Sequence, residues 1–225
     1  MNREVILEYL RGRNARKMPT IAELASELNI EGKELTGLIS LINNMELTGD
    51  IILTKKNRIA LPEDLGYFSG KIQIHQRGFG FLIRDGEKDK KSRNDIFIPP
   101  DVINSAMNGD TVLVKLSERT PLGSAKLEGE VVKIIKRNTT TVIGVYQESA
   151  NFGFVVPEDK KIRNDIFVQK GDSLNAKNND VVVCEITKYS TDSKSTAGKI
   201  ISVLGRKGDP GGRHAGDLCQ VCLAG

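Results

Sequence analysis

The part of the chain after residue 66 repeats itself, and this duplication limits the possible folds more than any other feature of the sequence. Four blocks recur in the same order, at offsets of 73, 70, 70 and 69 residues. The first copies are residues 78–82, 93–98, 108–114 and 129–135, and the second copies are residues 151–155, 163–168, 178–184 and 198–204. An ordered repeat of this kind predicts two successive copies of one domain of about 70 residues.

Each copy consists of short apolar runs separated by Gly and Asp residues. Five short strands in about 70 residues are typical of the closed barrel of the oligonucleotide-binding (OB) fold. We therefore predict an α+β multidomain chain with two all-β, cold-shock-like OB domains, at residues 67–137 and 139–206. Residues 207–225 are expected to be a disordered or truncated tail.

Alternation along the predicted strands indicates which side chains leave the barrel core. Ile96 and Ile98 point into the core, so Phe97 between them points outward. The two Phe residues of each Phe-Gly-Phe block also share one face, because they are two residues apart. The pattern predicts three Phe rings on one surface of each copy, namely Phe79, Phe81 and Phe97 in the first and Phe152, Phe154 and Phe167 in the second.

These rings account for six of the seven Phe residues of a chain that has no Trp. An aromatic surface beside cations is typical of sites that hold single-stranded nucleic acid, because every base can stack on a ring. Burial in the core, where most Phe residues lie, is the alternative interpretation. The candidate phosphate-binding residues are Lys71, Arg77, Arg84, Lys88, Lys90, Lys91 and Arg93 in the first copy and Lys160, Lys161 and Arg163 in the second.

Residues 1–64 do not belong to the repeat and are expected to form a winged helix-turn-helix. Apolar residues at helical spacing predict three helices, with a capping box from Thr20 to Glu23 at the start of the second. Alternating runs on either side of residues 55–57 predict a hairpin. The third helix begins with a single Lys, Lys33, beside two acidic residues, so it has few side chains that could donate hydrogen bonds to DNA bases. A packing or positioning role is therefore expected for this module.

Composition excludes several classes of protein. With 39% hydrophobic residues among 225 and a net charge of +4, the chain is not disordered throughout. It has no apolar run of the roughly 18 residues that a membrane span needs, and its N-terminus lacks the layout of a signal peptide. Three cysteines do not form a disulfide framework, so a cytoplasmic location is expected.

The repeated motifs resemble the RNA-binding motifs of cold-shock domains. Residues 77–82 resemble the first ribonucleoprotein motif, and residues 95–98 resemble the second. Cold-shock domains usually place a His two residues after the Phe of the second motif, whereas this chain has Pro99 and Gln169 there. A winged helix followed by two such domains resembles the N-terminal region of the ribonuclease R family, which belongs to the ribonuclease II group of exoribonucleases.

This resemblance implies that the tandem domains guide single-stranded RNA, 3′ end first, into a following Mg²⁺-dependent catalytic domain. It implies single-stranded RNA as the partner, with structured RNA and the ribosome as further candidates, and a monomer without membrane contact. The sequence itself contains no cluster of closely spaced aspartates, so no catalytic residue, metal site or cofactor is assigned within it. The chain alone is expected to bind RNA without cleaving it.

Two other interpretations stay open. A stand-alone regulator or RNA chaperone would use the winged helix on duplex DNA, and a complete hydrolase would need the missing aspartate cluster. Cys219 and Cys222 form a single Cys-x-x-Cys pair, but zinc would need two further ligands. We therefore expect no metal in the tail.

Overall fold

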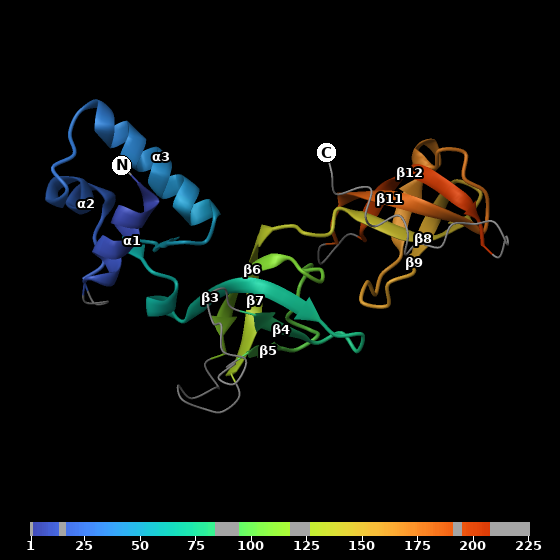
Figure 1. The fold of residues 1–225 in the computed structure, drawn as a ribbon, viewed down its shortest axis with the longest axis horizontal. Helices are drawn as coiled ribbons and strands as arrows, with labels where there is room; N and C mark the ends of the chain where they lie inside the picture. Colours follow the sequence, from blue (N-terminus) through green and yellow to red (C-terminus); the bar gives the residue numbers. More distant parts are fainter. Residues whose placement is uncertain (1, 14–16, 84–94, 118–126, 191–194, 208–225) are drawn as a thin grey trace. The chain divides into compact units, whose positions relative to one another are not determined.

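The computed structural model describes residues 2–13, 17–83, 95–117, 127–190 and 195–207 (Figure 1). The chain divides into two compact units. The first unit comprises residues 1–73, 80–103 and 110–136, and the second comprises residues 74–79, 104–109 and 137–225.

The first unit begins with three helices, α1 (Arg3–Arg11), α2 (Ile21–Glu27) and α3 (Lys33–Leu47). Their apolar stripes meet in one core, because residues three and four apart share a helix face. None of these described helices has the length and apolar character needed to cross a membrane. The core side chains with at most 1% exposure are Ile6, Leu24, Leu38, Ile42, Met45, Ile51 and Ile59.

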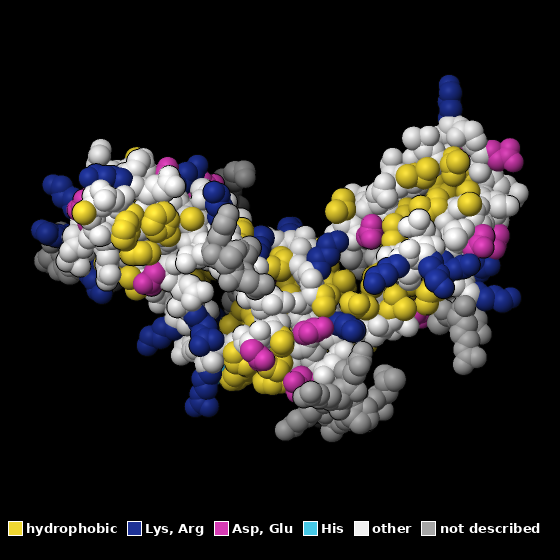
Figure 2. Space-filling view, turned by 180° about the vertical axis from the view of Figure 1, so that it is seen from behind, with side chains coloured by type: hydrophobic (Ala, Val, Ile, Leu, Met, Phe, Trp, Pro, Cys, Tyr) yellow, Lys and Arg dark blue, Asp and Glu magenta, His cyan; other side chains and the backbone are white. Residues whose placement is uncertain are grey.

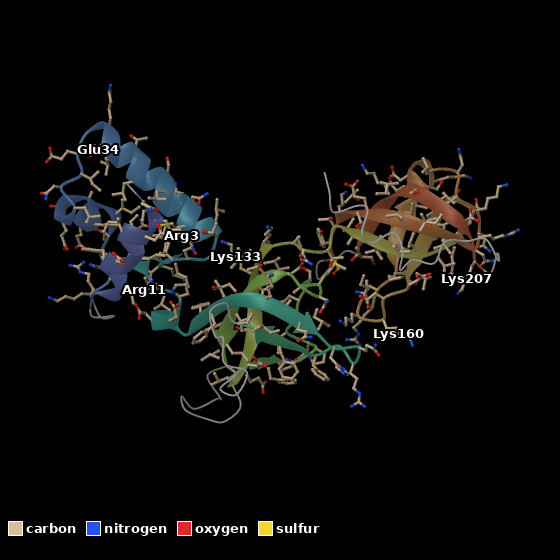
Figure 3. The ribbon with its side chains drawn as sticks, in the orientation of Figure 1. Arg3, Arg11, Glu34, Lys133, Lys160 and Lys207 are labelled. Atoms are coloured by element: carbon tan, nitrogen blue, oxygen red, sulfur yellow. The ribbon has the colours of Figure 1, made fainter. Side chains whose placement is uncertain are left out.

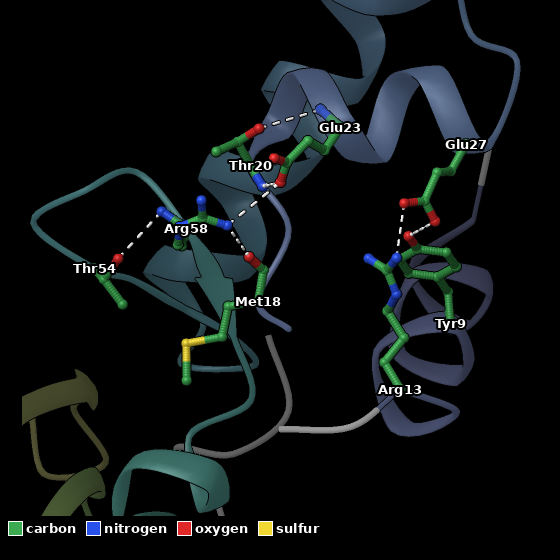
Figure 4. Close-up of polar contacts among 8 residues, drawn as sticks. All are labelled: Tyr9, Arg13, Met18, Thr20, Glu23, Glu27, Thr54 and Arg58. Carbon is green, nitrogen blue, oxygen red and sulfur yellow. Dashed lines mark hydrogen bonds and ion pairs between the residues drawn. The ribbon is translucent and has the colours of Figure 1, made fainter. Parts of the chain in front are cut away.

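The predicted capping box at the start of α2 is confirmed (Figure 4). The Glu23 backbone N–H donates to Thr20 Oγ1 at 3.2 Å, and the Thr20 N–H donates to Glu23 Oε2 at 2.8 Å. Thr20 also forms an isolated β-bridge with Arg58. The Arg58 guanidinium donates to the Met18 carbonyl at 2.6 Å, so the segment before α2 is tied to the hairpin that follows α3.

That hairpin consists of β1 (Ile52–Leu53) and β2 (Ile59–Ala60), which pair antiparallel. Both strands are shorter than the apolar runs of the sequence, and a short 3₁₀ helix, η1 (Glu63–Leu65), follows. The structure therefore shows three helices and a two-stranded sheet in this part of the chain.

A second polar contact links α1 to α2 (Figure 4). The Tyr9 hydroxyl donates to Glu27, and Arg13 Nη2 lies 2.7 Å from Glu27 Oε1. Burial and the hydrogen bond to Glu27 raise the pKa of Tyr9 to about 12. The same hydrogen bond is the main reason that the pKa of Glu27 is lowered.

The first barrel is closed by five strands in the order β3-β4-β5-β7-β6. Its strands are β3 (Tyr67–Ile74), β4 (Gly80–Ile83), β5 (Ile96–Ile98), β6 (Thr111–Leu116) and β7 (Leu127–Lys136). Strands β5 and β7 pair parallel. The barrel interior is aliphatic, and the side chains with at most 2% exposure are Ile72, Leu82, Ile96, Ile98, Val112, Val114 and Val131.

The second barrel has the same topology, in the order β9-β10-β12-β11-β8. Its strands are β8 (Thr141–Glu148), β9 (Phe152–Pro157), β10 (Ile166–Gln169), β11 (Asp180–Lys188) and β12 (Ala197–Arg206), with the 3₁₀ helix η2 (Lys170–Asp172) after β10. Strands β10 and β12 pair parallel. The fully buried side chains of its core are Val155, Ile166, Val168, Val182 and Cys184.

The duplication extends to the irregularities of the sheets. The pairing of β6 with β7 skips Val132 and Ile135, and the pairing of β11 with β12 skips Ile201 and Leu204. Each bulge of β12 lies 69 residues after its counterpart in β7, and this is the same offset that relates the sequences of the two strands. Because bulges bend and twist a strand, the two copies close their barrels in the same way.

Within the first unit, β7 contacts the end of helix α3 (Figure 3). Lys133 Nζ donates to the Glu46 carbonyl in the last turn of the helix at 3.1 Å, and the same carbonyl accepts the Gly49 N–H at 3.2 Å. A Cβ at Gly49 would lie 2.5 Å from Ile135 Cδ1, so the chain after α3 approaches the bulged part of β7 closely.

Candidate nucleic-acid interface

In the second barrel, three Phe rings from β9 and β10 lie together. Phe154 and Phe167 are directly opposite each other in the antiparallel register, and Phe152 is opposite Gln169. The ring centroids of Phe152 and Phe154 are 5.3 Å apart, those of Phe152 and Phe167 5.7 Å, and those of Phe154 and Phe167 5.9 Å. We call Phe152, Phe154 and Phe167 the second-barrel aromatic cluster.

The pleat of the two strands explains why these rings leave the core. Gly153, Val155, Ile166 and Val168 point into the barrel and are buried, and the cluster residues alternate with them on the other face. Phe152 is 36% exposed, and Phe154 and Phe167 are partly buried against one another. Edge-to-face contacts of this kind are worth about 0.5–1.5 kcal/mol beyond area burial, so the rings hold a fixed arrangement while keeping open surface.

In the first barrel, Phe81 on β4 is opposite Phe97 on β5, with ring centroids 5.7 Å apart and an interplanar angle of 61°. Ile96 and Ile98 are fully buried and Phe97 is partly exposed, in the alternation that the sequence predicts. Phe79 differs from its counterpart Phe152, because β4 begins at Gly80 and leaves Phe79 in the preceding turn. The sequence had placed Phe79 and Phe81 on one strand.

Phe79 is in contact with the ring of a histidine from the end of the preceding strand. The imidazole ring of His75 lies parallel to the Phe79 ring, with centroids 4.6 Å apart and planes 6° apart. His75 follows the last residue of β3 and is exposed. The sequence carries no signal specific to this contact, because it depends on the exact turn between β3 and β4.

The predicted phosphate-binding cations are only partly described by the structure. Lys71, Arg77, Lys160 and Arg163 are exposed, and Lys161 is half-buried. Lys160 lies between β9 and β10 (Figure 3). On the face drawn in Figure 2, the second barrel shows an exposed hydrophobic patch with both Lys or Arg and acidic side chains around it. The other predicted cations lie outside the described residues: Arg84, Lys88, Lys90, Lys91 and Arg93.

The carboxylates near the interface make turn contacts. Asp180 Oδ2 accepts a hydrogen bond from the Lys177 N–H at 2.8 Å. Among the residues that the structure describes, no group of three or more His, Cys, Asp or Glu side chains is arranged to hold a metal ion. Cys219 and Cys222, and the expected tail to which they belong, lie outside the described part of the chain.

Family models match both barrels. A cold shock domain model matches residues 154–214, and a ribonuclease B OB domain model matches residues 70–134. Ribonuclease R of Escherichia coli strain K12 is 35% identical to this chain over 208 residues, which cover 91% of the chain and 24% of that protein. Ribonuclease R of Thermotoga maritima is 32% identical over 171 residues, which cover 75% of the chain and 22% of that protein.

A solved structure shares the fold. Ribonuclease R of Mycoplasma genitalium, in its apo form and in complex with ribose methylated single-stranded RNA, matches with a TM-score of 0.55 and 18% identity. The match covers 64% of this chain and 22% of the Mycoplasma chain.

The two closed barrels and their family matches therefore define a tandem OB-fold protein of the cold-shock class. Within that class, the chain is a relative of the N-terminal region of ribonuclease R. It spans about a quarter of the length of the Escherichia coli relative.

Proposed function

We propose that this chain binds single-stranded RNA on the aromatic surfaces of its two barrels. The observation that carries this proposal is the second-barrel aromatic cluster, whose three rings contact one another and keep open surface on a barrel with a buried aliphatic core. Each base stacked on such a ring contributes about 1–3 kcal/mol, without requiring a particular sequence.

Exposed cations on segments that adjoin the ring-bearing strands support the same function. Lys160 and Arg163 are exposed on the segment that joins β9 to β10, the two strands that carry the cluster. Lys71 and Arg77 are exposed on and after β3 in the first barrel. Contacts between such side chains and phosphates release counterions, so the binding should weaken steeply with salt.

We further propose three domains with the boundaries that the sequence predicts, residues 1–64, 67–137 and 139–206, and a winged helix-turn-helix fold for the first. The order of three helices and a hairpin supports this assignment, and so does the bridge from Thr20 to Arg58, which places a third short segment beside the hairpin. The contacts of Lys133 and Gly49 favour a positioning role for the module against the first barrel.

For the whole protein, we propose that these domains guide RNA into the catalytic domain of a ribonuclease R-like exoribonuclease. The similarity to the N-terminal quarter of such proteins supports this role. The Mycoplasma relative of the same fold holds single-stranded RNA in its solved complex. The present chain should then bind RNA and leave it intact when Mg²⁺ is supplied.

Binding of a labelled oligoribonucleotide, measured by fluorescence anisotropy in competition with duplex DNA, tests the proposal. We expect single-stranded RNA to compete at least tenfold better than duplex DNA. Replacing Phe152, Phe154 and Phe167 together by Leu keeps apolar volume but removes the flat rings, and it should weaken RNA binding more than tenfold. Preference for duplex DNA, or unchanged binding by a folded triple-Leu variant, would contradict the proposal.

A further inference from the structure

The hairpin between β3 and β4 holds His75 in a fixed position. The His75 N–H donates to the Phe79 carbonyl at 2.8 Å, and the Gly78 N–H donates to the His75 carbonyl at 2.8 Å. Gly78 has a φ of +91°, a conformation that glycine adopts without the penalty of a Cβ. The chain therefore reverses direction at this turn, which brings the His75 and Phe79 side chains together.

The imidazole is also oriented by its own hydrogen bond. His75 Nδ1 lies 3.2 Å from the backbone nitrogen of Arg77 and accepts its N–H. In a neutral imidazole the other nitrogen, Nε2, then carries the proton. Together with the parallel contact to Phe79, this bond favours one orientation of the imidazole.

One face of the His75 ring covers Phe79, and the side chain as a whole is exposed. A flat, oriented and exposed ring stacked on a Phe ring is a stacking platform for a base. Aromatic and imidazole rings serve in this way where proteins recognise single-stranded RNA.

The second barrel does not have this feature. Its hairpin between β8 and β9 is closed by the corresponding hydrogen bond, in which the Ser149 N–H donates to the Phe152 carbonyl at 2.9 Å. Ser149 therefore occupies the position of His75, just as Phe152 occupies that of Phe79. A serine side chain offers no ring for stacking.

We propose that the outer face of His75 is an additional stacking position for a base of single-stranded RNA, present in the first barrel and absent from the second. The inference rests on the proposed function and deepens it, because it assigns one more nucleotide to the first barrel. His75 has two roles in this proposal: it covers Phe79, and it receives the base itself.

Affinity measurements on the full chain with a labelled oligouridylate test the first consequence. His75→Ala should weaken binding about fivefold or more, since a single stacked base contributes at least about that factor. His75→Phe restores a flat ring and should bind within about twofold of the parent chain, whereas His75→Leu should bind as weakly as His75→Ala. Ser149→Ala, the matched change in the other hairpin, should leave the affinity unchanged.

Proton NMR separates direct stacking from an indirect effect through Phe79. The chain has only two His residues, so His75→Phe identifies the imidazole C–H signals of His75 by their loss. A base stacked on the ring should move these signals upfield when the oligouridylate is added. Ser149→His should in turn increase the affinity, by supplying the missing ring in the second barrel.

The outcomes distinguish this inference from the proposed function. Failure of the parent chain to bind RNA would overturn both. RNA binding that depends on the second-barrel aromatic cluster but not on His75 would overturn only the inference, as would a loss of affinity in His75→Ala without a shift of the His75 signals in the parent chain.

Discussion

The ring of Tyr146 lies over the Cα atom of Gly153, so that a Cβ at position 153 would lie 2.5 Å from Tyr146 Cζ. This relationship explains why glycine separates the two Phe residues of the cluster in β9. The Tyr146 ring fills the barrel interior beside Gly153, on the face of β9 opposite to the outward-pointing Phe152 and Phe154 side chains. Burial in this position also raises the pKa of Tyr146, with a further contribution from Glu148.

Gly153→Ala is therefore expected to destabilise the second barrel by about 1–3 kcal/mol, the usual cost of overpacking a core. The reactivity of Cys184 reports this change, because the thiol is buried in the same core and its pKa is raised to about 11. Alkylation of Cys184, followed by peptide mass spectrometry over a urea series, should begin at lower urea in the variant.

Gly80→Ala is the matched control in the first barrel. Its Cβ would lie 3.2 Å from Cδ1 and Cγ1 of Ile72, a less severe approach than that to Tyr146 at position 153. This variant should leave the urea dependence of Cys184 alkylation unchanged. Alkylation of Gly153→Ala at the same urea concentration as in Gly80→Ala and the parent chain would show that Tyr146 yields to a methyl group at position 153.

Phe152→Ala should weaken the binding of single-stranded RNA about tenfold without loss of stability. Phe152 is the most exposed ring of the cluster, so its removal takes away a stacking surface rather than core packing. Leu174→Ala is the matched control, because Leu174 is 55% exposed on the same barrel and carries no ring. Anisotropy titrations of both variants check the prediction, and a similar loss in both would indicate a general hydrophobic effect.

The features that could be predicted from the sequence are those set by local spacing. The alternation of Ile96, Phe97 and Ile98 determines which side chain leaves the barrel, because a strand has a period of two residues. The capping box of Thr20 and Glu23 is equally local, since its two hydrogen bonds lie within four residues. The order of the three helices and the hairpin follows from runs of the same kind.

The features that could not be predicted depend on how separate segments meet. The stacking of His75 on Phe79 needs the exact turn between β3 and β4, and the contact between Tyr146 and Gly153 needs the register of β8 with β9. The bulges at Val132 and Ile201 leave no signal in the alternation of apolar residues. In each case the hydrophobic pattern is compatible with several registers, and packing in the closed barrel selects one.

Removing two cations beside the second-barrel aromatic cluster should reduce the salt dependence of RNA binding. Each phosphate contact to a single strand adds about 0.7 to the slope of log affinity against log salt concentration. If each of the two side chains contacts one phosphate, Lys160→Ala combined with Arg163→Ala should therefore reduce the slope by about 1.4. Titrations at several salt concentrations measure it directly.

Lys115→Ala provides the comparison for a single lost charge. Lys115 lies opposite Glu130 in the pairing of β6 with β7, among acidic neighbours that do not attract phosphate. The slope for this variant should equal that of the parent chain. A reduction in Lys115→Ala of about half that in the double variant would mean that net charge, and not the position of the cations, governs the salt dependence.

The pair of Tyr9 and Glu27 should make the helical part of the chain sensitive to alkaline pH. Because the folded-state pKa of Tyr9 is raised from 10.0 to about 12, its contribution to stability is complete below pH 10 and is lost as the pH rises through 12. Near-ultraviolet absorbance of the parent chain minus that of Tyr9→Phe isolates the titration of this one hydroxyl. Titration near pH 10 would contradict the contact seen between Tyr9 and Glu27.

Glu27→Gln separates the two causes of this shift. Burial is the larger cause and stays in the variant, whereas the hydrogen bond to a charged carboxylate is lost. The pKa of Tyr9 should therefore fall only part of the way toward 10.0. In Tyr9→Phe, the pKa of Glu27 should rise part of the way toward its ordinary value, because Arg13 still lowers it. The stability that this carboxylate contributes above its unfolded pKa should therefore decrease. An unchanged Tyr9 titration in Glu27→Gln would assign the whole shift to burial.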